Sequence, residues 1–531
     1  MRTAKTIILA TIGLATMPTA QCALPAGYGG SASCAPCHRA IYSSYTKTAM
    51  AASSGATDNG RQLESWNKSA FADPAARFRY QVKRDAAGLF FEFADTGGSL
   101  RGRKALPYFI GSGSAARSYI IADNGYLFEA PVAFYANGSR WALAPRYEVY
   151  DYPYLTRPIL PGCLACHASF LSPIAATQNR YASPPFAEAG VACERCHGPG
   201  AQHAARRGPI VNPAKLDPVR RDSVCSQCHL SGEVRLRVKG ADWDTYQPGE
   251  ILLDSVKVFV RANPNTAMTV SGHVEKLEQS ACKRASGDKL WCGSCHDAHS
   301  VPAPSKRVAA FRARCLACHM LAACKATKTE RSKRGDDCTS CHMPKSNVRD
   351  AQHVVYTDHS ISRRPLPREP AASSGALVPF GRVESSARDV ALAYAIAGDK
   401  ERALPLLEAL PIAGSDTEVL LYLAELYRND NRSQLAIPLY RRAMTLDPSQ
   451  VTASTGLGGI MMEQSNFGEA IPLWEDALSK NSGLLMVRTN LAMAYWKSGD
   501  KQAAERHLLK AIEISPGFAP AVDLLKTLRG R

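Results

Sequence analysis

The last third of the chain repeats a pattern of small and bulky apolar positions with a period of 34 residues. A small residue recurs at this spacing, and a bulky one follows each copy by four positions: Ala436 and Tyr440, Ala470 and Trp474, Ala504 and Leu508. Residues four apart share one face of a helix. The pattern therefore predicts paired helices that approach closely at the small residues and are filled between by the bulky ones.

This period is typical of tetratricopeptide repeats, an α-solenoid architecture. We expect the array over residues 385–531, as three clear repeats and a partial one around 391–403, with a capping helix over 519–528. Such an array has a concave surface that binds other proteins. The alternative is that it only pads or dimerises the molecule. His507 falls on the second helix of a repeat and is expected at the surface.

Residues 55–160 follow a different pattern, in which apolar and polar side chains alternate. The alternation is clear at 78–82 and 89–93, as in strands with one buried face. Residues 118–128 contain two further runs on either side of Asn124 and Gly125, and this dipeptide is a strong signal for a hairpin turn. The sequence predicts a β-rich insertion over 55–160.

The two ends of the remaining sequence have distinct compositions. A basic start, an uncharged apolar stretch at 6–17 and small residues at 20–23 predict a cleaved signal peptide over 1–22. Cys22 is expected to be lost with the signal or just after it, with lipidation as the alternative. Residues 364–384 are rich in proline and small residues, which predicts a linker. No later stretch has the roughly 20 apolar residues of a membrane span, so we expect an exported, periplasmic protein with no transmembrane segment in the mature chain.

The net charge of +17 comes from 64 Lys and Arg against 47 Asp and Glu in 531 residues. The basic residues are spread along the chain rather than run together, so nucleic acid is not expected as a partner. A basic surface suits an acidic redox partner or an anionic substrate.

The pentapeptide Cys-x-x-Cys-His is the main chemical signal, and composition alone would give roughly 0.01 copies by chance. It is typical of c-type haem attachment, in which both thiols bond the porphyrin and the histidine binds the iron. Zinc sites and disulfides are the alternatives, but zinc needs a second ligand pair and a repeated two-residue gap makes a poor disulfide framework. Seven copies occur: Cys34/Cys37/His38, Cys163/Cys166/His167, Cys193/Cys196/His197, Cys225/Cys228/His229, Cys292/Cys295/His296, Cys315/Cys318/His319 and Cys338/Cys341/His342.

Seven covalently attached c haems are therefore expected over residues 27–363. With only about 20 to 30 residues per haem along much of this stretch, the porphyrins themselves must supply the core. The expected fold class is mainly α: a haem-packed multihaem cytochrome c region with a β-rich insertion, followed by the α-solenoid.

The second axial ligands are sought among the histidines outside the motifs. Because His299 follows His296 by three residues and His203 follows His197 by six, each is better placed to bind the iron of a neighbouring haem. Met50 is a candidate for haem 1 or a neighbour, with a packing methionine as the alternative, and the remaining shortfall leaves an iron that a small substrate could reach. Without His507, five histidine candidates remain: His203, His273, His299, His353 and His359.

Two more cysteines, Cys282 and Cys324, lie outside the motifs. In an oxidising compartment they could form a disulfide that clamps the segments around haems 5 and 6. Free buried thiols are the alternative.

Several motifs resemble those of known multihaem cytochromes. Residues 28–38 resemble the first haem site of the tetrahaem cytochrome that accepts electrons in ammonia oxidation, and 193–203 resemble another site of that family, shared with hydroxylamine oxidoreductase-like proteins. Residues 292–299 resemble the doubled Cys-x-x-Cys-His units of decahaem cytochromes. The full arrangement, which covers most of residues 27–363, is similar to bacterial multihaem proteins with tetratricopeptide repeats.

This resemblance implies a periplasmic electron carrier, with His203 and His299 as distal ligands. The chain departs from the family at Met50, near which the family places a histidine. No Cys-x-x-Cys-Lys motif is present, which argues against an enzyme like the pentahaem nitrite reductases.

Three functions follow from these observations. The first is electron transfer along the haems, with the repeats docking redox partner proteins or organising a complex. The second is a multihaem oxidoreductase that acts on a small nitrogen or sulfur compound at an open iron. The third is a repeat domain that binds proteins according to the redox state of the haems.

Overall fold

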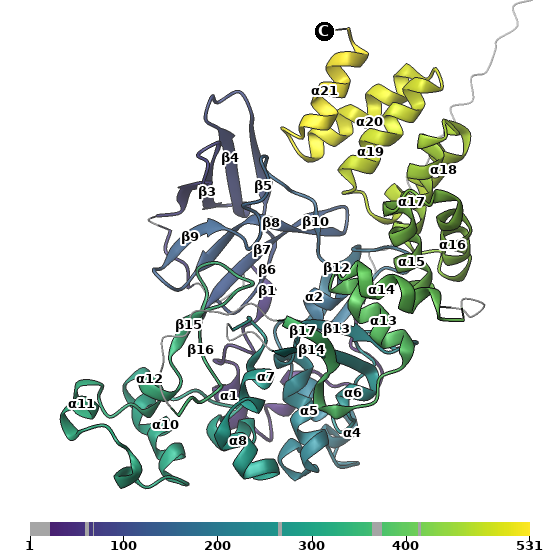
Figure 1. Cartoon of the computed structure of the whole chain (residues 1–531). Helices are drawn as coiled ribbons and strands as arrows, with labels where there is room; N and C mark the ends of the chain where they lie inside the picture. Colours follow the sequence, from purple (N-terminus) through teal and green to yellow (C-terminus); the bar gives the residue numbers. More distant parts are fainter. Residues whose placement is uncertain are drawn as a thin grey trace, which may run out of the picture.

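The structure is a computed structural model, which describes residues 22–58, 63–66, 68–263, 268–363, 374–411 and 416–530. The predicted signal peptide lies almost entirely outside these residues. The described chain has three parts: a β-rich part, a part with short helices that holds the motifs, and a C-terminal helical array (Figure 1). Among the described residues, no helix combines the length and the apolar character that crossing a membrane requires.

The β-rich part contains two antiparallel sheets. The first has the order β1-β6-β7-β8-β10, with β9 also paired to β8, and the second has the order β2-β3-β4-β5. The strands are β1 (Ser54–Ala56), β2 (Ala70–Ala72), β3 (Phe78–Asp85), β4 (Gly88–Asp95), β5 (Arg101–Ala105), β6 (Tyr108–Ile110), β7 (Ala116–Asp123), β8 (Tyr126–Tyr135), β9 (Arg140–Leu143) and β10 (Arg157–Pro158).

The predicted hairpin is confirmed as β7 and β8. Asp123 pairs with Tyr126 across the turn, and both turn residues have positive φ, 50° at Asn124 and 83° at Gly125. A two-residue turn of this kind matches the twist of the flanking strands. Asn and Gly are the residues that adopt these angles at least cost, so the dipeptide determines the turn.

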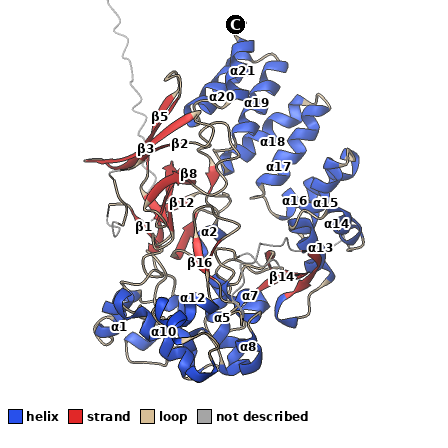
Figure 2. Cartoon of the chain, turned by 60° about the vertical axis from the view of Figure 1, so that its left-hand side comes forward, coloured by secondary structure: helices blue, strands red, loops and turns tan. Residues whose placement is uncertain are grey.

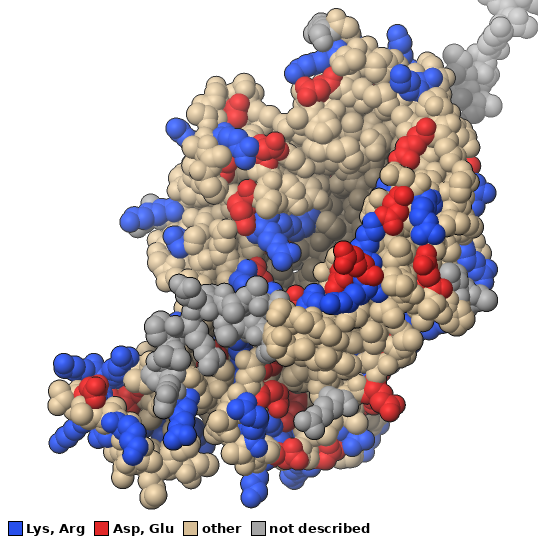
Figure 3. Space-filling view, viewed as in Figure 1, with Lys and Arg blue, Asp and Glu red and all other residues tan. Residues whose placement is uncertain are grey.

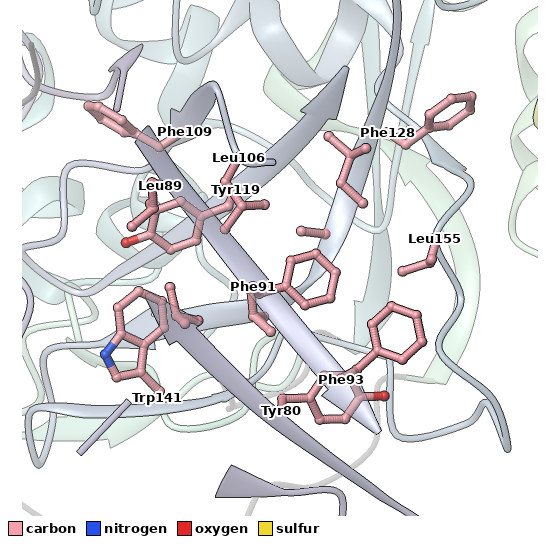
Figure 4. Close-up of a cluster of buried hydrophobic side chains, with 14 of the residues drawn as sticks. Tyr80, Leu89, Phe91, Phe93, Leu106, Phe109, Tyr119, Phe128, Trp141 and Leu155 are labelled. Atoms are coloured by element: carbon pink, nitrogen blue, oxygen red, sulfur yellow. The ribbon is translucent and has the colours of Figure 1, made fainter. Parts of the chain in front are cut away.

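Alternation along the strands buries one set of side chains between the sheets. On β3, residues 78, 80 and 82 are buried and the residues between them are exposed. Phe91 and Tyr119 are fully buried, and the ring of Tyr119 stacks on that of Trp141 at 5.3 Å between centroids. Figure 4 shows these aromatic side chains packed together. This core contains no motif residue, so the β-rich part has a core of its own.

The motif-bearing part consists of short helices and three small sheets. The sheets are the pairs β11 with β12 and β15 with β16, and the three-stranded β13-β14-β17. The strands are β11 (Ser169–Pro173), β12 (Tyr181–Glu188), β13 (Val234–Arg237), β14 (Val256–Asn263), β15 (Lys345–Asn347), β16 (Val355–Thr357) and β17 (Ser374–Pro379); the α-helices are α1 (Arg39–Tyr45), α2 (Pro161–Ala165), α3 (Glu194–His197), α4 (Ala201–Ala204), α5 (Pro218–His229), α6 (Leu252–Ser255), α7 (His273–Glu278), α8 (Ala281–Ser286), α9 (Cys292–Cys295), α10 (Arg307–Leu316), α11 (Lys328–Lys333) and α12 (Cys338–His342).

The expectation of a mainly α chain needs correction. The described residues form seventeen strands in five sheets, so the part before the repeats is a mixture of helix and strand. The sequence pattern indicated the strands of the insertion but not the small sheets among the motifs. Part of the predicted linker is also a strand: β17 pairs with β14 at Val378 and Val260.

The C-terminal part forms the predicted stack of paired helices. The small residues Ala436, Ala470 and Ala504 are fully buried, as are the bulky Tyr440, Trp474 and Leu508. A Cβ at Gly458 would lie 2.5 Å from Nε1 of Trp474, so glycine is required where this large ring fills the gap. The helices are α13 (Ala387–Ile396), α14 (Lys400–Glu408), α15 (Thr417–Asn429), α16 (Ser433–Leu446), α17 (Val451–Glu463), α18 (Phe467–Lys480), α19 (Leu485–Lys497), α20 (Lys501–Ile514) and α21 (Ala519–Leu528).

The end of the repeat array contacts the β-rich part. The Tyr126 hydroxyl donates to the carbonyl of Ser479, the Ser515 hydroxyl donates to the carbonyl of Pro153 at 3.1 Å, and the ring of Phe518 lies 5.4 Å from that of Tyr152. The last helices of the array therefore lie against the β-rich part (Figure 2). The space-filling view shows a hollow between the array and the β-rich part (Figure 3).

A substitution at Gly483 should weaken this contact. A Cβ there would lie 2.5 Å from the ring of Phe128 and 3.0 Å from Thr156, so Gly483→Ala overpacks the junction at about 1–3 kcal/mol. We expect faster hydrogen exchange in β8 and in the α18–α19 turn. Gly468→Ala is the matched control, since no atom lies within 4 Å of its Cβ position. Equal exchange in the two variants would contradict the contact.

Candidate functional site

Each Cys-x-x-Cys-His motif lies on a short helix or a helical turn. The backbone N–H of the histidine bonds the carbonyl of the first cysteine in several copies, at 2.9 Å for His38, 3.1 Å for His197 and 2.9 Å for His296. This helical bond places the two thiols about one turn apart on the same side. It also holds the imidazole beside the thiols, as a single haem requires.

Thiols of different motifs lie against one another. Cys34 is beside Cys193, Cys166 beside Cys228, Cys225 beside Cys292 and Cys315 beside Cys338. These contacts join motif 1 to motif 3, motif 2 to motif 4, motif 4 to motif 5, and motif 6 to motif 7. Motifs far apart in sequence are therefore neighbours in space.

The two cysteines of a motif do not have the same surroundings. Cys37 of motif 1 is exposed to solvent, and the sulfur of Cys341 in motif 7 lies 4.0 Å from the Ser340 hydroxyl. In these two motifs the first cysteine, Cys34 or Cys338, faces the neighbouring motif. In motifs 2 and 4 the second cysteines, Cys166 and Cys228, are the ones in contact. Haem attachment at all fourteen motif cysteines, Cys37 and Cys341 included, stays a prediction from the sequence.

The first histidine cluster pairs motif histidines with histidines from elsewhere. His38 and His203 are stacked with centroids 6.2 Å apart and ring planes at 15°. His197 and His299 are stacked at 5.8 Å and 14°. His203 thus lies beside the histidine of motif 1, and His299 beside that of motif 3.

The second cluster contains the histidines of motifs 4 and 5. His229 lies 5.2 Å from His273 with the rings nearly perpendicular. His296 lies 6.2 Å from His359 with the planes at 30°, and His359 is also 4.9 Å from His273. Burial lowers the pKa of His273 to about 3 and also lowers that of His167. Both are therefore neutral near pH 7, the form that binds metals.

Three of these separations match the space that one iron occupies. A metal–nitrogen bond of about 2 Å on each side, plus roughly 1 Å from each nitrogen to its ring centre, places two imidazoles on opposite sides of an iron about 6 Å apart. The pairs His38–His203, His197–His299 and His296–His359 have this spacing. The residues therefore fit a six-coordinate haem.

Backbone carbonyls orient several of these imidazoles. Nδ1 lies 2.8 Å from the carbonyl of Val211 in His197, 2.8 Å from that of Ser362 in His342, and 2.9 Å from that of Thr357 in His359. A proton on Nδ1 that is donated to a carbonyl leaves Nε2 free as a metal ligand.

The remaining candidates lie elsewhere. His353 contacts Arg140 at 2.6 Å and the ring of Tyr135 at 5.2 Å, and the described residues give it no ring contact with a motif histidine. His507 is half-buried and stacks on Tyr495 in the repeat array. The backbone carbonyl of Met50 accepts a bond from the Ser53 hydroxyl, which also contacts the carbonyl of His167, so Met50 lies close to motif 2.

Cys282 and Cys324 are free thiols in the structure. Cys282 lies near Cys295 and Cys315, of motifs 5 and 6. Cys282 therefore belongs to the same part of the molecule as these motifs.

The segment from residue 284 to 347 has no buried residue, although all of it is described and it carries motifs 5, 6 and 7. The apolar side chains of α10 include Phe311, whose ring lies 5.5 Å from that of His296. A segment of this length that folds without a core of its own needs another apolar surface to cover. Haem is such a surface, and the short spacing between the motifs leads to the same expectation.

A buried ion pair in the β-rich part is separate from the motifs. Arg117 and Glu64 lie 2.7 Å apart with side chains 3% and 5% exposed, and the Tyr119 hydroxyl donates to Glu64 at 2.6 Å. They line a cavity of about 160 Å³. Burial alone would raise the pKa of Glu64, but Tyr119 and Arg117 outweigh it and hold that pKa below its ordinary value.

Removal of one partner should destabilise this part. Arg117→Met leaves a buried carboxylate unpaired, which costs about 3–5 kcal/mol. Because the pKa of Glu64 is lowered in the folded state, its contribution is present above the unfolded pKa and is lost as pH falls through the folded one. The difference in thermal midpoint between wild type and variant should therefore shrink in acid. A difference that grows in acid would contradict the assignment.

Comparisons with known proteins cover separate parts of the chain. The family described as cytochrome c554 and c-prime matches residues 153–198, and the doubled CXXCH motif matches 284–323. Tetratricopeptide repeats match 419–452 and 487–518. The first two stretches contain motifs 2, 3, 5 and 6. A comparison with curated proteins returned no match.

Several solved structures are similar to part of the chain. A crystal structure of MamA is 21% identical over 28% of this chain and 85% of that one, with a TM-score of 0.26. YrrB, described as a TPR protein with an unusual peptide-binding site, is 20% identical over 26% of this chain and 73% of that one, with a TM-score of 0.25. MamA from Desulfovibrio magneticus RS-1 is 19% identical over 27% and 82%, with a TM-score of 0.26.

Proposed function

Because this chain joins a multihaem c-type cytochrome to tetratricopeptide repeats, we propose that it carries single electrons along seven covalently attached c haems while the repeats bind a partner protein. Bound haem supplies the one-electron iron couple. The observation that carries the proposal is the set of histidine pairs spaced for an iron, together with the contacts between motifs. We place the protein in the periplasm, after export by residues 1–22.

The protein's own residues hold and orient the redox centres. The fourteen motif cysteines, Cys37 and Cys341 included, attach the porphyrins, and the seven motif histidines are the proximal ligands. We assign His203 to haem 1, His299 to haem 3, His273 to haem 4 and His359 to haem 5 as distal ligands. Each assignment brings in a ligand from outside its own motif, which ties neighbouring segments together around one iron.

The contacts between thiols support a continuous route. Motifs 1 and 3, 2 and 4, and 4 and 5 are in contact through their cysteines. Cys196 of motif 3 also lies near Cys225 of motif 4, which connects the first pair to the rest. Cys295 of motif 5 lies near Cys318 of motif 6, and motif 6 contacts motif 7. Neighbouring attachment sites keep the porphyrins close, as exchange of single electrons requires.

A mass measurement and a redox titration test the proposal. The mature protein should exceed the mass of its polypeptide by seven haems. Electron paramagnetic resonance during the titration should show several low-spin centres with two histidine ligands at distinct potentials. A colourless protein, or a mass with fewer than several haems, would reject the proposal.

An oxidoreductase is the second candidate, favoured by one observation. Among the described residues, no second histidine ring lies beside His167, His319 or His342, and of these three only His167 has a buried Nδ1 without a hydrogen-bond partner. An open iron at motif 2 could bind a small nitrogen or sulfur compound. Carbon monoxide should bind the reduced wild-type protein if this iron is open, and its failure to bind any haem would reject the enzyme.

A further inference from the structure

A single lobe carries a large excess of positive charge. Residues 306–345, which we call the basic lobe, comprise α10, α11 and α12 and hold motifs 6 and 7. They contain ten Lys and Arg but only three Asp and Glu. The two haems of this lobe bring about four propionates, which cannot cancel a net charge of +7. Figure 3 shows these basic side chains around the lobe at the lower left.

The three acidic residues of the basic lobe are used within it. Glu330 accepts from the backbone N–H and the hydroxyl of Thr327 at 2.7 and 2.8 Å. Asp337 caps α12 through the N–H of Thr339 at 2.9 Å, and Asp336 pairs with Arg331 at 3.3 Å. Among the described residues, Arg331 is the single basic residue of the lobe that forms an ion pair. Of the other nine cations, all except Arg312 are exposed, so they are available to an external partner.

The repeat array differs in charge. Residues 385–531 contain 16 Lys and Arg and 17 Asp and Glu, and many of these form ion pairs with each other. Arg388, for example, contacts Asp416 and Glu418, both at 2.6 Å. The positive charge of the chain is therefore not on the domain expected to bind proteins. Of the chain's net charge of +17, +7 surrounds two attachment sites at the far side of the molecule (Figure 1).

Motif 6 itself reaches the surface. Cys318 and His319 are exposed, and Met320 is 79% exposed. A haem held by these exposed residues would be within reach of a partner protein. A haem that exchanges electrons with another protein needs such a position.

Resting on the proposed function, we propose that the basic lobe is the port where electrons enter or leave, and that its partner is a small acidic redox protein. Complementary charge steers such a partner and raises its association rate by roughly 10- to 1,000-fold. A membrane surface is a poorer fit, because an interfacial helix presents aromatic and leucine side chains beside its basic face. The one aromatic residue of α10, Phe311, is half-buried against His296 instead, and the exposed apolar side chains of this helix are limited to Val308 and Leu316, at 39% and 38% exposure.

Charge reversal on the basic lobe tests the proposal. The variant Lys325→Glu/Lys328→Glu/Lys333→Glu changes three exposed residues of the lobe. The matched control, Arg442→Glu/Lys501→Glu/Arg506→Glu, makes the same change of charge on exposed residues of the repeats. Flavodoxin, a small acidic one-electron carrier, is the probe. Its affinity is measured with both proteins oxidised, and its rate of electron donation is measured after reduction.

At low salt we expect affinity and rate to fall on the order of 10- to 100-fold in the lobe variant and to stay near wild type in the control. The difference should close at about 0.5 M salt, where charges are screened. A Lys→Gln version of the lobe variant should fall between the two, and equal haem content by mass shows that each variant has matured.

Other outcomes would reject the basic lobe as the site where electrons enter or leave. If the wild type accepts electrons and the lobe variant matches the control, the port is wrong while the proposed function stands. If no variant accepts electrons from flavodoxin or from dithionite, the proposed function itself fails. If the lobe variant loses only its binding to phosphatidylserine vesicles, the lobe is a membrane-binding surface and the acidic protein partner is rejected.

Discussion

In a Cys315→Ser/Cys318→Ser variant, which cannot attach haem 6, we expect residues 284–347 to unfold while the β-rich part and the repeats stay folded. No residue of this segment is buried by the polypeptide. Its helices α10, α11 and α12 are ten, six and five residues long, too short to be stable alone in water. Without the porphyrin, apolar side chains such as Phe311 lose the surface that they would cover.

Limited trypsin digestion measures this effect. The segment is rich in Lys and Arg, so cleavage in the basic lobe should accelerate on the order of tenfold or more once its local stability is lost. The repeat array, with Tyr440 and Trp474 buried in its own core, should remain as a protected fragment. Mass measurement should find one haem fewer per chain.

Cys282→Ser/Cys324→Ser is the matched control, because it removes two cysteines of the same region that lie outside the motifs. We expect its digestion to match that of the wild type. Rapid cleavage in this control would mean that a disulfide, and not haem, holds the segment. Slow cleavage in the Cys315→Ser/Cys318→Ser variant would show that the polypeptide packs without haem 6.

The sequence predicted the features that depend on local spacing. The repeat helices follow from Ala436, Ala470 and Ala504 at intervals of 34, and the β7–β8 turn follows from Asn124 and Gly125. Both are decided within a few residues, by helix faces and by backbone angles. The attachment motifs belong to the same class, since two thiols and an imidazole are specified by five consecutive positions.

Features that depend on long-range contact were not predictable in the same way. The pairing of His296 with His359 joins residues that no periodicity relates. Strand β17 comes from a stretch whose proline and small residues predicted a linker, because its partner β14 lies more than a hundred residues earlier. The contact of Ser515 with Pro153 likewise brings together the end of the repeats and the β-rich part. These contacts depend on how the whole chain is folded in space. A single sequence does not show which distant segments come together.

The distal assignments give the second large effect. In His299→Ala, we expect haem 3 to lose its sixth ligand and become high-spin, so that the reduced protein binds one more carbon monoxide per chain than the wild type. The rings of His197 and His299 lie 5.8 Å apart and within 14° of parallel, and Nδ1 of His197 is held by the carbonyl of Val211. The proximal side should therefore remain ordered when the distal ligand is removed.

His353→Ala is the control, since His353 contacts Arg140 and Tyr135 rather than a motif histidine. It should leave the spin state and the carbon monoxide stoichiometry unchanged. His203→Ala should open haem 1 in the same way, and the double variant with His299→Ala should bind two more molecules than the wild type, because the two pairs belong to different irons. A single additional molecule in the double variant would mean that both histidines serve one iron, which would refute the separate assignment of haems 1 and 3.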